Sequence, residues 1–221
     1  MKKNIFGLII VFLLFSTFNP KISFLENLNF KPHVKNIKIL NNSIVKARDI
    51  REKLDFLYSK NLLFIKNKDI EKKLIDENFI ESFALKRIYP DTLIIKIFEK
   101  KPIAILQNKK KKFIISNKGD LLTFRKLEKN EKLPMVFGEG KSFYNFYRNI
   151  KNSNFPVEEV QAFYFFESKR WDILLYDGKL IKLPIKNYIY SLKNFMNLKK
   201  NNIHKKYKVF DYRITNQLIL N

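Results

Sequence analysis

The residue types that most often perform chemistry are sparse in this chain. It has two histidines, His33 and His204, and no cysteine. The histidines stand apart, without the ligand spacing of a metal site, so we expect both on the solvated surface. The acidic pairs Asp76-Glu77 and Glu158-Glu159 are neighbours in sequence, with no spacing that would bring two carboxylates together in space. We therefore expect neither a metal site nor a general acid–base pair.

The signatures of nucleotide and acyl-transfer chemistry are also missing from the sequence. It contains no G-x-S-x-G elbow, no Walker loop and no dinucleotide-binding loop. With five glycines in 221 residues, a loop that wraps phosphate is improbable. The aromatic residues recur at strand and helix spacing, which is typical of core packing rather than of a base-stacking surface. We expect a protein that is not an enzyme and needs no cofactor.

The net charge of +23 has two interpretations. One is a surface that binds nucleic acid or another polyanion, and the other is a general compositional bias toward lysine. Only seven residues are arginine, although bidentate recognition of phosphates and bases favours arginine. The lysines are spread along the chain, and the run Lys109–Lys112 reads as a solvated hairpin tip. We favour the compositional interpretation and expect no nucleic-acid partner.

The N-terminal segment has the pattern of a membrane anchor. Lys2 and Lys3 precede an uncharged apolar run from Ile5 to Phe18, which is short for a span of about 20 residues. A cleaved signal peptide is the alternative, but the small residues of a cleavage site are absent after the run. We expect a cytoplasmic tail at 1–4, an uncleaved signal anchor at 5–22, and the remainder outside the cytoplasm.

After a tether at residues 23–33, the next segment predicts an α+β domain over 34–101. Pro90-Asp91 is a turn between two runs of β-branched and aromatic residues, and Leu93, Ile95 and Ile97 fall on one buried face. The expected order is strand, helix, helix, strand, strand, with both helices on one face of a three-stranded sheet. The supporting segments are a strand at 34–39, a helix at 48–57 with Ile50, Leu54 and Leu57 buried, a helix capped by Asn67 with Ile70, Leu74 and Ile75 buried, and a strand at 82–89.

Residues 102–221 predict a second domain, mostly antiparallel β with two helices. Turn signals such as Asn117–Asp120 and Asp177-Gly178 separate the expected strands. We expect the two domains to meet at Glu99–Pro102, with few core contacts crossing that point. The expected strands are 103–108, 113–116, 121–124, 135–137, 157–166, 171–176, 180–183, 208–213 and 217–220, and the helices are 143–150, capped by Ser142, and 185–196.

The ordered set of these features resembles the FtsQ/DivIB family of bacterial cell-division proteins. The hairpin and the residues after it are similar to that family's end of a POTRA domain and entry into its β domain. The terminal Asp211-Tyr212-Arg213 is also similar to the family pattern. At the ends the chain departs from it, with only four residues before the apolar run and Asn221 directly after the last expected strand. The motif residues are Arg87, Tyr89, Pro90, Asp91, Thr92, Leu93, Glu99, Pro102 and Asp211.

The resemblance implies a non-enzymatic scaffold of the division complex, anchored by a single pass in the inner membrane with its C-terminus in the periplasm. Its role would be to link early and late division proteins and to help control septal peptidoglycan synthesis. The POTRA domain would dock further division proteins, and the C-terminal end of the β domain would bind small coiled-coil partners, FtsB and FtsL. By position, the family's partner-contact segment corresponds to Arg213, Ile214, Thr215, Asn216, Gln217 and Leu218.

Physical reasoning supports that site in outline, because a terminal strand at 217–220 would be a sheet edge that can accept a partner strand. Alternatively, Leu218 and Leu220 only complete the core face of the sheet. If the edge recruits a strand, a proline at Asn216 or at Gln217 should damage binding at one position and folding at the other. Two other classes stay open: a POTRA-type chaperone or translocation module, and a membrane-tethered polyanion binder.

Overall fold

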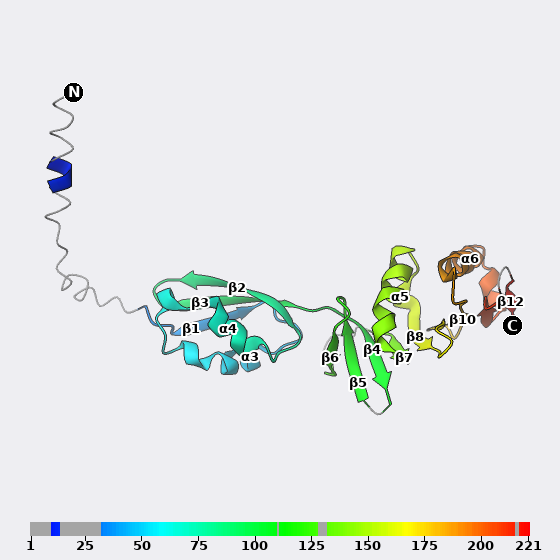
Figure 1. Cartoon of the computed structure of the whole chain (residues 1–221), viewed down its shortest axis with the longest axis horizontal. Coiled ribbons are helices and arrows are strands. Elements are labelled where there is room, and N and C mark those ends of the chain that lie inside the picture. Colours follow the sequence, from blue (N-terminus) through cyan, green and yellow to red (C-terminus); the bar gives the residue numbers. More distant parts are fainter. Residues whose placement is uncertain (1–9, 14–31, 110, 128–131, 215–216) are drawn as a thin grey trace, which may run out of the picture. The chain divides into compact units, whose positions relative to one another are not determined.

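The computed structural model describes residues 10–13, 32–109, 111–127, 132–214 and 217–221 (Figure 1). The chain divides into two compact units. The first unites the residues up to Leu40 with Ala47–Lys73 and Ala84–Lys96, and the second unites Asn41–Lys46, Leu74–Phe83 and Ile97–Asn221. The division passes through strands of the first sheet, while the first strand of the second sheet begins at Pro102. A domain boundary at Glu99–Pro102 stays a prediction.

The first sheet has the order β1-β3-β2, with β1 at Asn36–Leu40, β2 at Ile80–Ile88 and β3 at Thr92–Glu99. β1 runs parallel to β3, and the predicted turn joins β2 to β3, with a cis peptide bond before Pro90. The alternation in β3 gives one buried face, as expected from its sequence. Leu93, Ile95 and Ile97 are each fully buried.

Short helices connect β1 to β2: α3 (Ala47–Lys53), η1 (Asp55–Leu57), η2 (Leu62–Phe64) and α4 (Asn67–Leu74). The helix expected at 48–57 is therefore two pieces, although its predicted stripe of Ile50, Leu54 and Leu57 is fully buried. The prediction for Ile75 is wrong, because α4 ends at Leu74 and the Ile75 side chain is 75% exposed.

The second sheet contains nine strands in the order β12-β11-β10-β9-β8-β7-β4-β5-β6. Three neighbouring pairs are parallel, β4 with β7, β7 with β8, and β10 with β11. The others are antiparallel, which confirms a mostly antiparallel domain. The strands are β4 (Pro102–Asn108), β5 (Lys111–Ser116), β6 (Leu121–Thr123), β7 (Met135–Phe137), β8 (Val160–Phe165), β9 (Trp171–Leu175), β10 (Leu180–Lys182), β11 (Val209–Asp211) and β12 (Ile219–Leu220).

The second unit also carries α5 (Gly140–Asn152) and α6 (Tyr188–Lys200), with single 3₁₀ turns η3 (Val157–Glu159) and η4 (Ile203–Lys206). Ser142 is not the cap of α5, because the helix begins at Gly140 and the Ser142 hydroxyl donates to the Glu139 carbonyl. A Cβ on Gly140 would lie 2.8 Å from a Leu106 methyl group. The missing side chain thus lets the helix start one turn early.

The start of α6 differs from the sequence prediction for a backbone reason. Asn187, immediately before the helix, has a φ of 59°, in the left-handed region. That conformation cannot continue a right-handed helix, so the residues from Ile185 to Asn187 form a separate bend instead of the first turn. The helix in turn runs four residues past Met196, to Lys200.

Aromatic side chains form the centre of the second unit's core. The Phe146 ring stacks on Trp171, with centroids 4.9 Å apart and planes 12° apart. Phe143 meets both Phe163 and Trp171 edge to face at 5.1 and 5.7 Å. Such pairs add about 0.5–1.5 kcal/mol each beyond area burial. This cluster fixes α5 against β8 and β9, and so positions the surface beside the start of β9.

The two histidines have different environments. His33 is exposed as expected, but His204, in η4, is only 9% exposed and its Nδ1 has no hydrogen-bond partner among the described residues. Burial, together with the charges of Lys179 and Lys199, lowers the pKa of His204. The expectation of a solvated side chain was wrong because η4 packs its ring inward.

Among the described residues, no helix has both the length and the apolar character needed to cross a membrane. Residues 10–13 are helical. The other residues of the predicted tail, anchor and tether, up to residue 31, lie outside the described part of the chain. The predicted tip at Lys109–Lys112 does join β4 to β5, and the three lysines of it that are described are exposed.

Candidate functional site

The last strand of the chain, β12, is an edge of the nine-stranded sheet (Figure 1). It pairs with β11 on one side, with Phe210 opposite Leu220 and Asp211 opposite Ile219. Val209 and Asn221 exchange both main-chain hydrogen bonds, at 2.9 and 3.1 Å. Hydrogen-bonded and non-bonded pairs alternate along an antiparallel ladder. It follows that the N–H and C=O groups of Leu218 and Leu220 point away from β11.

This edge is shorter than the sequence predicted. The expected strands 208–213 and 217–220 shrink to Val209–Asp211 and Ile219–Leu220. The Gln217 N–H donates to the Ile214 carbonyl in a turn rather than to a ladder. Leu218 and Leu220 are half-buried and pack on the core. The same two residues therefore complete the core and expose main-chain groups at the edge.

A row of alternating charges crosses the sheet next to the edge. Asp172 of β9 is opposite Lys182 of β10, which is opposite Asp211 of β11. Arginines flank the row at both ends. Arg170 Nε lies 3.4 Å from an Asp172 oxygen, and Arg213 Nη2 lies 2.6 Å from an Asp211 oxygen.

The two carboxylates of the row respond oppositely to their surroundings. The hydrogen bond from Arg213 holds the pKa of Asp211 below its usual value. For Asp172, burial is the larger influence and raises the pKa despite Arg170. The Asp211 carboxylate in turn raises the pKa of Arg213. The row therefore presents two guanidinium groups at its ends, with carboxylates that fix their directions.

A groove of about 1000 Å³ runs beside the C-terminal segment. One wall is formed by the first turns of α6 and the other by Tyr212–Ile214 together with Gln217 and Leu218. Tyr212 is 7% exposed, and its hydroxyl donates to Asn194 Oδ1 at 2.9 Å. Burial raises the pKa of that phenol, so it stays neutral and ties the two walls together.

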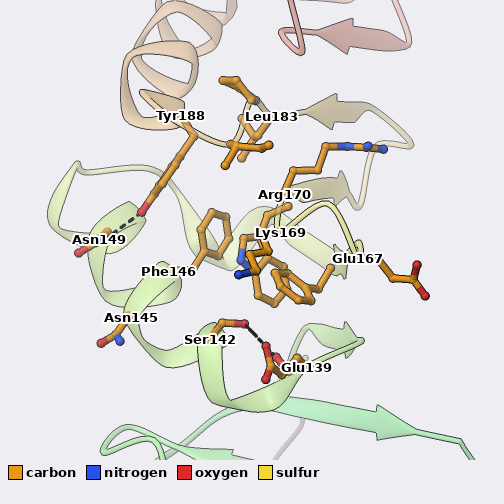
Figure 2. A pocket seen from close by; sticks show the side chains of 14 residues that line it. Glu139, Ser142, Asn145, Phe146, Asn149, Glu167, Lys169, Arg170, Leu183 and Tyr188 are labelled. Carbon is orange, nitrogen blue, oxygen red and sulfur yellow. Dashed lines mark hydrogen bonds between the residues drawn. The ribbon is translucent and has the colours of Figure 1, made fainter.

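A second hollow, of about 650 Å³, shares Pro184 and Ile185 with the first. Figure 2 shows the Phe146 and Tyr188 side chains turned toward this hollow, with the Asn149 amide donating to the Tyr188 hydroxyl at 2.9 Å. Arg170 extends from its rim, away from the rings. The two hollows meet at the apolar residues Pro184 and Ile185, with a guanidinium group beside each part.

The structure brings together four of the six residues matched to a partner-contact segment. Arg213, Ile214, Gln217 and Leu218 all line the groove. Thr215 and Asn216 lie outside the described residues. Sequence reasoning missed Arg170, the shared apolar surface around Pro184 and the aromatic wall. The signal for Arg170 was its position one residue before Trp171, but only the pairing of β9 with β10 relates it to Arg213.

Apart from Pro102, the remaining motif residues, at positions 87–99, lie in the first sheet and its loops. The Arg87 guanidinium donates to the carbonyls of Leu62 and Ile65, and the Glu99 carboxylate accepts from main-chain N–H groups at 43–45. The Asp91 carbonyl accepts from the N–H groups of residues 35 and 36, and its carboxylate accepts from the Thr92 hydroxyl. Tyr89 is half exposed, Pro90 forms the turn, and Leu93 is buried. Pro102 opens β4.

Comparison with protein families matches both parts of the chain. Residues 33–100 match the family model described as POTRA domain, FtsQ-type, and residues 104–213 match the one described as cell division protein FtsQ/DivIB, C-terminal. The fold and these matches define a cell-division protein with a POTRA domain followed by a β domain. The chain belongs to the FtsQ/DivIB family.

The chain is similar to curated relatives over much of its length. The cell division protein FtsQ of Rickettsia bellii is 31% identical over 153 residues, which are 67% of this chain and 57% of that protein. FtsQ of Rickettsia typhi is 27% identical over 188 residues, which are 80% of this chain and 70% of that protein. The chain thus spans little more than half of the first relative.

A solved structure, the major extracytoplasmic domain of the trans isomer of the cell division protein DivIB from Geobacillus stearothermophilus, is also similar. It is 14% identical, with a TM-score of 0.33, and the match covers 46% of this chain and 92% of that one. The family assignment does not depend on this likeness.

Proposed function

We propose that this chain is a non-enzymatic scaffold of the division complex, which links early and late division proteins and helps control septal peptidoglycan synthesis. The observation that carries the proposal is the exposed edge of β12 beside a groove lined by both apolar and polar side chains. An edge strand offers main-chain donors and acceptors that pair with an added strand. Scaffolds act through such surfaces, whereas an enzyme would need convergent reactive groups.

The partner that fits this surface has an extended segment followed or preceded by an amphipathic acidic helix. The extended segment would pair with the outward groups of Leu218 and Leu220. The helix would lay its apolar face over Pro184 and Ile185, with acidic residues opposite the guanidinium groups. FtsB- and FtsL-like coiled-coil proteins are the proposed partners at this edge, and further division proteins would dock on the POTRA domain.

We also propose that the protein is anchored in the inner membrane by residues 5–22, with a cytoplasmic N-terminus and a periplasmic C-terminus. A reporter that is active only in the periplasm, fused after Asn221, should be active. Activity of a cytoplasm-only reporter at the same position would show the opposite orientation. A mature protein beginning near residue 20 would show that the run is a cleaved signal peptide.

The edge is tested with a matched pair of variants, Leu220→Pro and Leu220→Ala. Both remove the half-buried side chain, but only proline removes the outward N–H. If that N–H pairs with a partner strand, proline should weaken binding of an FtsB-like partner more than alanine does. A lost hydrogen bond with an unpaired partner carbonyl costs about 1–3 kcal/mol, which corresponds to roughly a 5- to 100-fold weaker complex.

Calorimetric binding beside thermal melting would give the answer. Equal affinity of the two variants, at equal melting temperature, would show that no partner strand pairs there. Arg213→Glu should separately weaken binding, by repelling an acidic helix. Gln217→Pro should lower the melting temperature, since the Gln217 N–H closes a turn onto Ile214; Asn216→Pro is then expected to be the variant that damages binding.

A further inference from the structure

Between residues 32 and 109, the most exposed aromatic side chain lies on η2. The 3₁₀ helix places residues three apart on one face, so Leu62 and the next-turn Ile65 are buried, at 0% and 3% exposure. The two residues between them face outward: Leu63 is 50% exposed and Phe64 is 75% exposed. Two large apolar side chains therefore project together from a single turn.

This turn is held firmly rather than projecting from a loose loop. The Arg87 guanidinium donates to the Leu62 carbonyl at 3.0 Å and to the Ile65 carbonyl at 2.7 Å. The Asn61 side chain accepts from the Leu63 N–H at 2.9 Å. Three hydrogen bonds thus fix the backbone on both sides of Phe64, and the apolar pair cannot fold back into the core.

The turn is hydrogen-bonded to the beginning of the described stretch 32–109. The Leu62 N–H donates to the Pro32 carbonyl at 2.6 Å. Residues 23–31 separate Pro32 from the proposed anchor at 5–22, and nine residues reach at most about 30 Å. A membrane that holds the anchor is therefore never far from Phe64.

The charge beside the apolar pair suits an anionic surface. Lys66 and Lys68 are exposed, and among the described residues neither forms an ion pair. Lys60 is partly neutralised by Asp69, 3.4 Å away. Lysines beside a projecting phenylalanine are a pattern of membrane-surface segments, in which the ring enters the headgroup layer while the ammonium groups meet phosphates.

We propose that Leu63 and Phe64 insert into the headgroup region of an anionic phospholipid membrane, with Lys66 and Lys68 contacting the phosphates. The proposal rests on the proposed anchoring only for the proximity of the membrane. The surface area of two side chains is far smaller than the roughly 800 Å² that each partner buries in a stable protein interface. The two side chains suffice for a contact with lipid. Because the proposed anchor already holds the chain at the membrane, this additional contact is intramolecular.

The absence of cysteine allows a clean test in the full chain reconstituted into phosphatidylglycerol-containing vesicles. Phe64→Cys and Ile75→Cys each receive one environment-sensitive fluorophore; the two side chains are equally exposed, at 75%. Headgroup nitroxide lipids should quench the label at position 64 and leave the label at position 75 unquenched. A third label, at Ser16→Cys with acyl-chain nitroxides, reports separately whether the apolar run is inserted.

The second part of the experiment reverses the charge of the two lysines. Lys66→Glu with Lys68→Glu should reduce the quenching at position 64, since each lysine near an anionic surface contributes about a fivefold factor to binding. Lys111→Glu with Lys112→Glu changes the net charge equally near the tip of the β4–β5 hairpin and should leave the quenching unchanged. Equal quenching at positions 64 and 75 would overturn the proposal, whatever the Ser16 label shows. Quenching at position 64 that persists in purely zwitterionic vesicles would overturn the role of the lysines.

Discussion

Replacing Glu99 should loosen the loop that follows β1. The carboxylate accepts from the N–H groups of Ser43 (2.9 Å), Ile44 (3.0 Å) and Val45 (2.8 Å), and from the Ser43 hydroxyl (2.8 Å). Val45 is 1% exposed, so water cannot readily replace the lost acceptor at that residue. All four donors lie on three successive residues, which makes Glu99 the main attachment of this loop.

The magnitude follows from the number and kind of these bonds. A hydrogen bond to a charged group contributes about 1.5–3 kcal/mol, but four bonds to one carboxylate that is partly exposed are not additive. We expect Glu99→Ala to lower the free energy of local opening by about 3 kcal/mol, chiefly through the unpaired N–H groups. Glu99→Gln keeps one acceptor oxygen and should cost about half as much.

Hydrogen exchange at the three amides measures this directly, because exchange reports local opening. A loss of 3 kcal/mol predicts about 100-fold faster exchange at Ser43, Ile44 and Val45 in Glu99→Ala, with Glu99→Gln intermediate. Glu81→Ala is the control, since it removes a solvent-exposed ion pair with Lys118. An increase below about threefold in Glu99→Ala would refute the view that this carboxylate holds the loop.

Two further outcomes are expected in the second unit. Gly138→Ala should destabilise it by more than about 2 kcal/mol in denaturant unfolding, because the φ is +114° and a Cβ would lie 2.7 Å from that of Phe165; Gly178→Ala, with φ +83° and open space, should cost less. Arg213 depresses the folded-state pKa of Asp211, so this stabilisation is complete above the unfolded-state pKa of about 4 and is lost as pH falls through the lower folded value. The stability difference between the native chain and Asp211→Asn should therefore shrink as the pH is lowered from about 6 to about 2.5.

Much of the first sheet and its helices could be predicted from local sequence patterns. The turn at Pro90, the buried face of Leu93, Ile95 and Ile97, and the stripe of Ile50, Leu54 and Leu57 were all predicted from spacing and are all observed. These features depend on neighbours in the sequence, where the alternation of a strand or the turn of a helix acts directly. The prediction that Ile75 is buried was wrong because the spacing of apolar residues does not indicate where a helix ends.

The second sheet shows what spacing cannot reveal. Its strand segments were largely predicted, but β7 lies parallel between β4 and β8, and β10 lies parallel to β11. Such pairs join segments far apart in sequence, and nothing local encodes the partner. The charge row and the neighbouring hollows follow from that pairing. Arg170 could therefore not be related to Arg213 beforehand, although each was visible as a residue.

The family motif and the candidate site differ in the kind of information they contain. Arg87, Glu99 and Asp211 are charged side chains that hold carbonyls, N–H groups or another charge in place within this chain. Their identities matter because only a guanidinium or a carboxylate makes several such bonds at once. A strand added at an edge such as β12 would pair with main-chain groups, which every residue possesses except that proline lacks the N–H. The sequence signature therefore marks contacts that hold the framework of each sheet, whereas an edge leaves little trace in residue identity.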